Sequence, residues 1–109
     1  MTFEVLFSTM KEALLKLDVS SIQQHYAFEF QVQGELQGVF YVEICHGQMN
    51  VEPYEYYDRD ALFLATGNTY LEICQGVLHP ALAYAVGRLK VSGDVGKARI
   101  WTDAICFAS

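Results

Sequence analysis

The sequence has no long apolar run and little positive charge. No stretch of roughly 18 uncharged apolar residues occurs among its 109 residues, so a membrane-spanning helix is excluded. Seven Lys and Arg stand against thirteen Asp and Glu, the net charge is −6, and the basic residues form no run. Nucleic-acid binding depends on a positive patch, so nucleic acid is excluded as the leading partner. The same deficit argues against electrostatic docking on anionic lipid and leaves at most a transient contact between an apolar patch and a membrane.

Cysteine is also scarce. Cys45, Cys74 and Cys106 are odd in number, widely spaced, and each preceded by isoleucine. This pattern is typical of small buried hydrophobes in a reducing compartment and not of a disulfide framework. The N-terminal residues show no basic region ahead of an apolar one, so we expect no secretory signal. The sequence therefore predicts a cytoplasmic protein.

Apolar residues, in contrast, are abundant, at 52% against 18% charged. This balance over 109 residues predicts a single globular domain, residues 1–109. Over residues 3–17, apolar side chains recur every three or four positions, which predicts an amphipathic helix. From His25 the period is two, which predicts strands with one buried face. These strands are expected at 26–33, 39–45, 49–53 and 61–65, the third at a sheet edge because Pro53 cannot donate to a ladder.

Helical patterns follow the fourth strand. Thr69 and Glu72 form a capping-box pattern that opens a short helix, and Gly76 can end it. Another helix is predicted from Pro80 to about Gly87. Its residues are apolar on nearly all sides, so we expect it to be covered on several sides.

The last segment is predicted to be a strand over residues 88–92 and then a helix capped by Asp94. The apolar residues of this helix fall into two adjoining stripes, although one stripe is enough to seal a sheet. The second stripe must face another helix, a bound apolar ligand or a partner chain. One stripe consists of Val95, Ala98, Trp101, Ile105 and Ala108, and the other of Ile100, Ala104 and Phe107.

An ordered series of glycine, proline, alanine and acid runs through the second half of the chain. It reads Gly76-Val77-Leu78-His79-Pro80, then Ala83, then Gly87-Arg88-Leu89-Lys90-Val91-Ser92-Gly93-Asp94, after the strand Ala61-Leu62-Phe63-Leu64-Ala65-Thr66. In this order and spacing, the series resembles the sterol carrier protein type 2 family. The resemblance implies an α+β fold: a five-stranded twisted sheet covered on one face by helices, with an apolar tunnel between the sheet and the helices.

The resemblance also implies non-enzymatic binding and transfer of a hydrophobic ligand, such as a sterol, fatty acid, fatty acyl thioester or isoprenoid, without a cofactor. A sixteen-carbon chain loses roughly 12 kcal/mol on entering water, at about 0.8 kcal/mol per methylene, so only a largely apolar cavity can hold it. The side chains expected to line this cavity are Phe28, Phe30, Val42, Leu62, Leu64, Leu71, Cys74, Leu78, Leu82, Ala85, Val86, Trp101 and Ile105.

The same side chains also fit an ordinary core, because protein interiors pack closely. The pattern alone favours core, and the resemblance favours a ligand cavity. The acid-rich stretch 52–60 is expected to be a solvated edge and turn. Its rings Tyr54, Tyr56 and Tyr57, with Phe63 beyond, form an alternative interaction surface.

The candidate reactive pairs are better explained as structural. Cys45 and His46 are neighbours, and adjacent strand residues point to opposite faces, so they cannot hydrogen-bond there. Cys74 and His79 lack the further ligands that a zinc site needs. We therefore expect no metal and no catalytic residue, with His79 at the start of a helix.

Three functions compete at this stage. The first is a carrier of a lipid or another apolar small molecule. The second is an accessory or scaffold subunit that presents a lipid or quinone precursor to a partner enzyme, and a homodimer fits either role. An enzyme acting on an apolar substrate ranks last, because the few His and Ser residues form no acid–base constellation.

Overall fold

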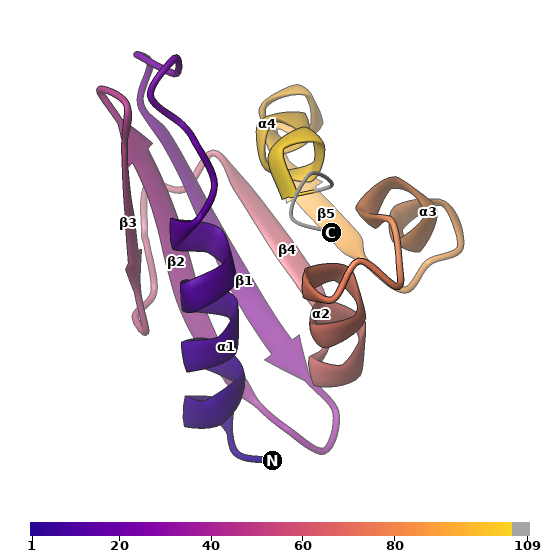
Figure 1. The fold of residues 1–109 in the computed structure, drawn as a ribbon. Helices are drawn as coiled ribbons and strands as arrows, with labels where there is room; N and C mark the ends of the chain where they lie inside the picture. The colour runs from indigo at the N-terminus through magenta and orange to yellow at the C-terminus, as the bar shows by residue number, and fades with distance from the viewer. Residues whose placement is uncertain (106–109) are drawn as a thin grey trace.

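The computed structural model describes the backbone of residues 1–105 and the side chains of residues 1–103 (Figure 1). Its elements follow the chain as α1 (Phe3–Leu15), β1 (Tyr26–Gln33), β2 (Gly38–Cys45), β3 (Gln48–Glu52), β4 (Ala61–Thr66), α2 (Gly67–Cys74), α3 (Pro80–Ala85), β5 (Lys90–Gly93) and α4 (Val95–Ile105). The predicted helices and strands are present in the predicted order, with ends moved by a few residues. Cys106 and the predicted continuation of the last helix to Phe107 and Ala108 lie outside the described residues.

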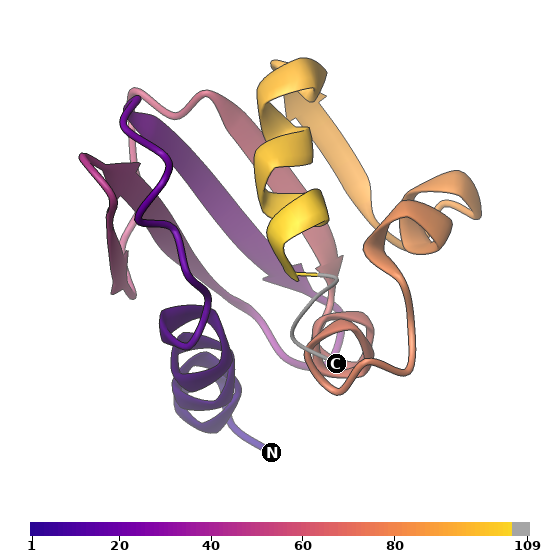
Figure 2. The same cartoon turned by 45° about the horizontal axis from the view of Figure 1, so that its top comes forward.

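The five strands form one mixed sheet in the order β3-β2-β1-β4-β5. β1 pairs antiparallel with β2 and parallel with β4, while β2–β3 and β4–β5 are antiparallel. All four described helices lie on the same face of this sheet (Figures 1 and 2). The predicted α+β class with five strands and one covered face is confirmed. β3 lies at an edge and ends before Pro53, as predicted.

The periodicity of the first helix places its apolar stripe on the sheet. The Thr2 hydroxyl accepts a hydrogen bond from Val5 N and caps α1. Leu6, Met10 and Leu14, spaced four residues apart, are completely buried. This stripe closes one half of the covered face.

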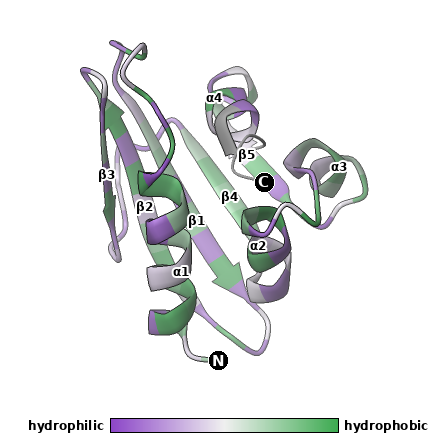
Figure 3. Cartoon of the chain, in the orientation of Figure 1, coloured by the Kyte–Doolittle hydropathy of each residue, from purple (hydrophilic) through white to green (hydrophobic). Residues whose placement is uncertain are grey.

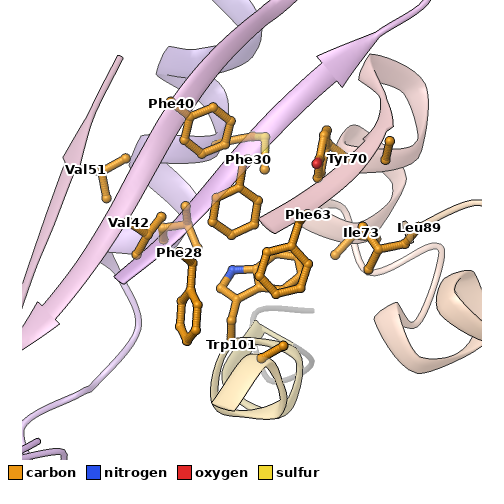
Figure 4. Packing of buried hydrophobic residues seen from close by; sticks show 14 of the residues in the cluster. Phe28, Phe30, Phe40, Val42, Val51, Phe63, Tyr70, Ile73, Leu89 and Trp101 are labelled. Carbon is orange, nitrogen blue, oxygen red and sulfur yellow. The ribbon is translucent and has the colours of Figure 1, made fainter. Parts of the chain in front are cut away.

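Aromatic side chains fill the middle of the space between the sheet and the helices (Figure 4). The ring of Phe30 stacks on Phe40 and Phe63, with centroids 5.0 Å and 4.8 Å apart. Trp101 of α4 lies 4.8 Å from Phe30 and 4.7 Å from Phe63. Within the described part of the chain, the Trp101 indole nitrogen has no hydrogen-bond partner. This part of the interior is therefore a packed aromatic core.

α2 begins earlier than the capping-box pattern predicted. The Thr66 hydroxyl accepts from Thr69 N, so Thr66 is the N-cap and Thr69 lies in the first turn. Gly76, with φ of 74°, ends the helix as predicted. The prediction of Thr69 as the cap was wrong because Thr66, three residues earlier, caps the helix and leaves Thr69 inside its first turn.

The segment between β3 and β4 covers part of the other face of the sheet. The backbone N–H of Tyr56 donates to the buried Glu29, and its hydroxyl donates to Glu43 at 2.7 Å. His25 Nε2 lies 2.8 Å from the same Glu43 oxygen. The hydrogen bonds from His25 and Tyr56 lower the pKa of Glu43, and the Glu43 carboxylate raises the pKa of Tyr56 to about 12.

These hydrogen bonds hold Tyr56 apart from the other rings of the predicted interaction surface. Tyr56 is fixed over Tyr41, with ring centroids 5.1 Å apart, whereas Tyr54 and Tyr57 are exposed. Phe63 lies in the core on the opposite face, so it takes no part in such a surface.

Candidate functional site

An apolar pocket of about 220 Å³ lies between α3, β5 and α4, beside the aromatic core. Three elements from the last third of the chain build it, and its walls carry both small and large apolar side chains. The pocket is lined by Ala81 and Tyr84 of α3, Val91 of β5, and Val95, Ala98, Arg99, Thr102 and Asp103 of α4.

The position of α3 is set at its two ends. His79 Nδ1 accepts from Ala81 N at 3.1 Å, so His79 caps the start of the helix, as expected from the sequence. Gly87 has φ of 81°, a left-handed conformation that ends the helix. Leu89 N then donates to Ala83 O, which ties the chain back beneath α3. Ala83 is buried and belongs to the core cluster.

α4 presents different residues to the pocket and to the core. Asp94 accepts from Lys97 N at 3.0 Å, which confirms the predicted cap. Trp101 faces the sheet and is buried in the aromatic core (Figure 4). Ala98 is a buried wall of the pocket, and Val95 lies exposed on its edge. Among the described members of the predicted stripe, Val95 and Ala98 therefore line the pocket and Trp101 does not.

The polar side of the pocket comes from α4. The Thr102 hydroxyl donates to the Arg99 carbonyl at 3.2 Å. Arg99 is exposed and forms no ion pair within the described residues. A guanidinium in this position can bind a carboxylate or phosphate head group by paired hydrogen bonds. The Asp103 carboxylate, one turn farther along α4, lines the same side, so the apolar walls meet one cation and one anion at this edge.

Most of the side chains predicted to line a ligand cavity lie in the core beside the pocket. They contact one another between the sheet and the helices and do not line the pocket itself. They are Phe28, Phe30, Val42, Leu78 and Trp101, which are buried, and Leu71 and Cys74, which are partly buried.

The placement expected for Leu62 and Leu64 was wrong. Along β4 they alternate with Phe63 and Ala65, which are buried in the core. Leu62 and Leu64 therefore lie on the opposite face of the sheet. A ligand between the sheet and the helices would not touch them.

The placement expected for Leu82, Ala85 and Val86 was also wrong. All three are exposed, Leu82 to 54% and Val86 to 60%. α3 is only six residues long and buries Pro80 and Ala83, so most of its apolar surface remains uncovered. The side chain of Ile105 lies outside the described residues.

Sequence reasoning missed most of the pocket. A helical-wheel argument would have found part of it, because pocket residues on α3 and α4 recur at three-and-four spacing. The tyrosine in an otherwise apolar helix was a second signal. The missed residues are Ala81, Tyr84, Val91, Arg99, Thr102 and Asp103.

The described residues offer little reactive chemistry. Burial raises the pKa of the Cys74 thiol to about 11, so it is protonated at neutral pH and is a poor nucleophile. Within residues 1–103, no group of three or more His, Cys, Asp and Glu side chains could hold a metal ion. No helix in the described part of the chain is long and apolar enough to cross a membrane.

Solved structures of similar fold cover nearly the whole chain. Palmitated SCP2L2 from Aedes aegypti is 19% identical with a TM-score of 0.73, covering 96% of this chain and 95% of that one. A UbiJ-SCP2 ubiquinone synthesis protein is also 19% identical, with a TM-score of 0.68 and coverage of 99% and 95%. At these identities the likeness shows the fold.

A third similar structure is a variant of the sec-alkylsulfatase Pisa1, an enzyme known from Pseudomonas sp.. It is 17% identical with a TM-score of 0.75 over 95% of this chain, but this chain spans only 16% of its length. No curated protein sequence matches the chain. The sequence profile of the SCP-2 sterol transfer family matches residues 4–104. The chain belongs to the SCP-2 sterol transfer family.

Proposed function

We propose that this protein binds a hydrophobic ligand, such as a sterol, fatty acid, fatty acyl thioester or isoprenoid, and carries it through the cytoplasm without covalent chemistry. The observation that carries the proposal is the pocket between α3, β5 and α4, with apolar residues from all three elements. Each methylene removed from water contributes about 0.8 kcal/mol, so apolar walls supply the affinity that such a ligand needs.

The size of the pocket bears on how a long ligand is held. At about 220 Å³ it is smaller than the roughly 300–1,000 Å³ of pockets that enclose drug-sized ligands. We infer that α3 moves outward to admit a long ligand, and that the chain of the ligand then displaces part of the aromatic core around Trp101 to open a tunnel between the helices and the sheet. The shortness and exposure of α3 support this motion.

A carrier role fits the polar groups of the pocket better than catalysis does. Its lining contains no histidine or cysteine. Thr102 and Asp103 are neighbours on one helix, so their side chains point in directions about 100° apart. An acid–base pair needs its two groups within hydrogen-bond reach, and this arrangement does not provide one.

Two matched substitutions on α3 test the proposal. Ala81→Trp places a large ring in the pocket, whereas Leu82→Trp places the same ring on the exposed side of the same helix, outside the pocket lining. We expect the wild-type protein to bind a fluorescent C16 fatty acid saturably, with Kd near micromolar, about −8 kcal/mol. Ala81→Trp should weaken binding by about tenfold or more, and Leu82→Trp should leave it unchanged.

The carrier proposal fails if purified wild-type protein shows neither co-purifying lipid by native mass spectrometry nor saturable binding of acyl and sterol probes. Equal losses in the two variants would place the ligand elsewhere. Circular dichroism of both variants checks that each is folded.

A second candidate function is an accessory subunit that presents a lipid or quinone precursor to a partner enzyme. It is favoured by the similarity of the whole chain to a UbiJ-SCP2 ubiquinone synthesis protein and by the exposed rings of Tyr54 and Tyr57. A pull-down from the source cells tests it. Capture of a lipid- or quinone-modifying enzyme that is lost in Tyr54→Ser/Tyr57→Ser would support this role, and capture of no enzyme would count against it.

A further inference from the structure

One buried polar atom of the aromatic core is left without a hydrogen bond. The side chain of Trp101 is 1% exposed, and its indole Nε1 reaches no acceptor within the described part of the chain. Buried polar groups in native proteins are almost always paired, because an unpaired buried donor destabilises the fold. In the same core, the buried Tyr70 hydroxyl donates to the Gln31 carbonyl at 3.0 Å. The unpaired N–H is therefore a specific feature of the Trp101 site.

Aromatic rings surround this N–H. Figure 4 shows the nitrogen edge of the indole on the side of Phe28 and Phe30, and both of these side chains are completely buried. The centroid of the Phe30 ring lies 4.8 Å from that of the indole, with 68° between the two planes. The face of a ring accepts an N–H only weakly, so an oxygen atom in the same place would bind it more strongly. The N–H thus keeps most of its capacity to bind an oxygen acceptor.

Trp101 lies next to the pocket along α4. Ala98 is a buried wall of the pocket, and Trp101 follows it by three residues, so the two share one side of the helix. β4, whose Phe63 contacts Trp101, is hydrophobic along nearly its whole length (Figure 3). A ligand that passes from the pocket toward the sheet therefore meets the indole N–H between apolar walls.

The chemistry of this site restricts the atom that can pair with it. An indole N–H only donates, so its partner must be an acceptor. No lysine or arginine is among the buried side chains of residues 1–103, and a carboxylate is costly to bury without a cation. The fitting acceptor is a neutral oxygen, such as that of a ketone, an ester or a hydroxyl group.

We propose that Trp101 is a specificity-determining residue, whose indole N–H donates a hydrogen bond to a neutral carbonyl or hydroxyl oxygen on the buried part of the ligand. The site thereby favours an oxygenated apolar ligand over a plain hydrocarbon chain of the same length. This inference rests on the proposed carrier function and adds to it the chemical class of the ligand.

A series of keto fatty acids tests the proposal. Stearic acid is compared with oxo-stearic acids in which a carbonyl replaces one methylene, at successive even-numbered carbons from near the head to near the methyl end. Each acid competes with the fluorescent C16 fatty acid for wild-type protein. We expect one position, or two adjacent ones, to bind about tenfold more tightly than stearic acid. The other ketones should bind no better than stearic acid, because their carbonyls are buried without a donor.

The wild-type protein offers a second readout that needs no substitution. Trp101 is the only tryptophan of the chain, so its indole N–H gives a single resonance in a proton–nitrogen NMR spectrum. With the favoured ketone bound, this proton should lie downfield of its position with stearic acid bound and should exchange more slowly with solvent. Both changes report a hydrogen bond to oxygen.

Two core substitutions separate the N–H from the ring that carries it. Trp101→Phe keeps an aromatic side chain and removes the donor, so the favoured ketone should lose its advantage over stearic acid. Phe63→Leu is the matched control, because it shrinks a ring in contact with Trp101 and keeps the donor, and it should retain the advantage. The ratio of the two affinities is measured within each variant, so a general loss of affinity does not affect it.

Three outcomes are decisive. If wild-type protein binds stearic acid but no ketone binds more tightly or moves the indole proton, the proposal is overturned and the N–H serves only the packing against Phe30. Persistence of the ketone preference in Trp101→Phe would overturn it as well. If wild-type protein binds none of these acids, the carrier function fails and this inference fails with it.

Discussion

Apolar side chains are buried in one part of this domain and exposed in another. In α1 and β1–β4, the apolar residues on the covered face are buried, and aromatic rings stack at the centre of the core. In α3, β5 and the start of α4, large apolar residues remain exposed around a pocket. The first part uses its hydrophobic residues to hold the fold. In the second part, packing leaves several large apolar side chains exposed, and these are available to bind a ligand or another surface.

The largest effect should come from breaking the aromatic core. Phe30→Ala removes a ring packed against Phe40, Phe63 and Trp101 and should lower the free energy of unfolding by about 3–5 kcal/mol. Leu82→Ala, in the second part, should change it by less than about 0.5 kcal/mol. Urea unfolding followed by circular dichroism measures both. A comparable loss in Leu82→Ala would show that α3 is packed like the core and would remove the contrast.

A smaller loss of stability is expected from a substitution on the other face of the sheet, at Glu29. Glu29 is buried, accepts from Tyr56 N and Gln31, and pairs with Arg59 at 3.6 Å. Glu29→Gln replaces one acceptor oxygen by a donor group and should cost about 1–3 kcal/mol. The exposed Glu55→Gln in the same segment is the control and should be neutral. Equal stability of the two variants would mean that Glu29 does not anchor the segment over the sheet.

The smallest effect on the free energy of unfolding is expected at Glu43, and it depends on pH. Hydrogen bonds from His25 and Tyr56 lower the pKa of Glu43 in the folded state below its ordinary value of 4.5. The stabilisation is therefore present above that value and is lost as pH falls through the lower folded-state pKa. Wild type should exceed Glu43→Gln in stability at neutral pH by no more than about 1 kcal/mol, because the pair is partly exposed. Unfolding curves at descending pH should show the stability difference between the two proteins shrinking. A constant difference would contradict the claim that these hydrogen bonds stabilise the ionised Glu43 carboxylate.

The sequence predicted the first part of the molecule well because its signals are periodic. Alternation in β1 and β2 and the stripe in α1 each correspond to a buried face. The error at Leu62 and Leu64 has a different origin. Alternation shows that these two share a face, but only the pairing of β4 with β1, which aligns Phe63 with Phe30, decides which face is covered. That pairing joins residues distant in the sequence.

The second part was harder to predict because apolar composition does not reveal what covers it. A six-residue helix without a polar face was expected to be buried on several sides, and Leu82 and Val86 are exposed. Composition averages over the chain, whereas a binding surface depends on local distribution.

One measurement tests the central claim, that the hydrophobic ligand binds between α3, β5 and α4. Stearic acid with a nitroxide on its chain is added to isotopically labelled protein, and paramagnetic broadening of the backbone amides is recorded by NMR. We expect the strongest broadening at Ala81, Val91 and Ala98, which line the pocket, and little at β3. Broadening centred on β3 or the loop before β4, with α3 and α4 unaffected, would contradict the account.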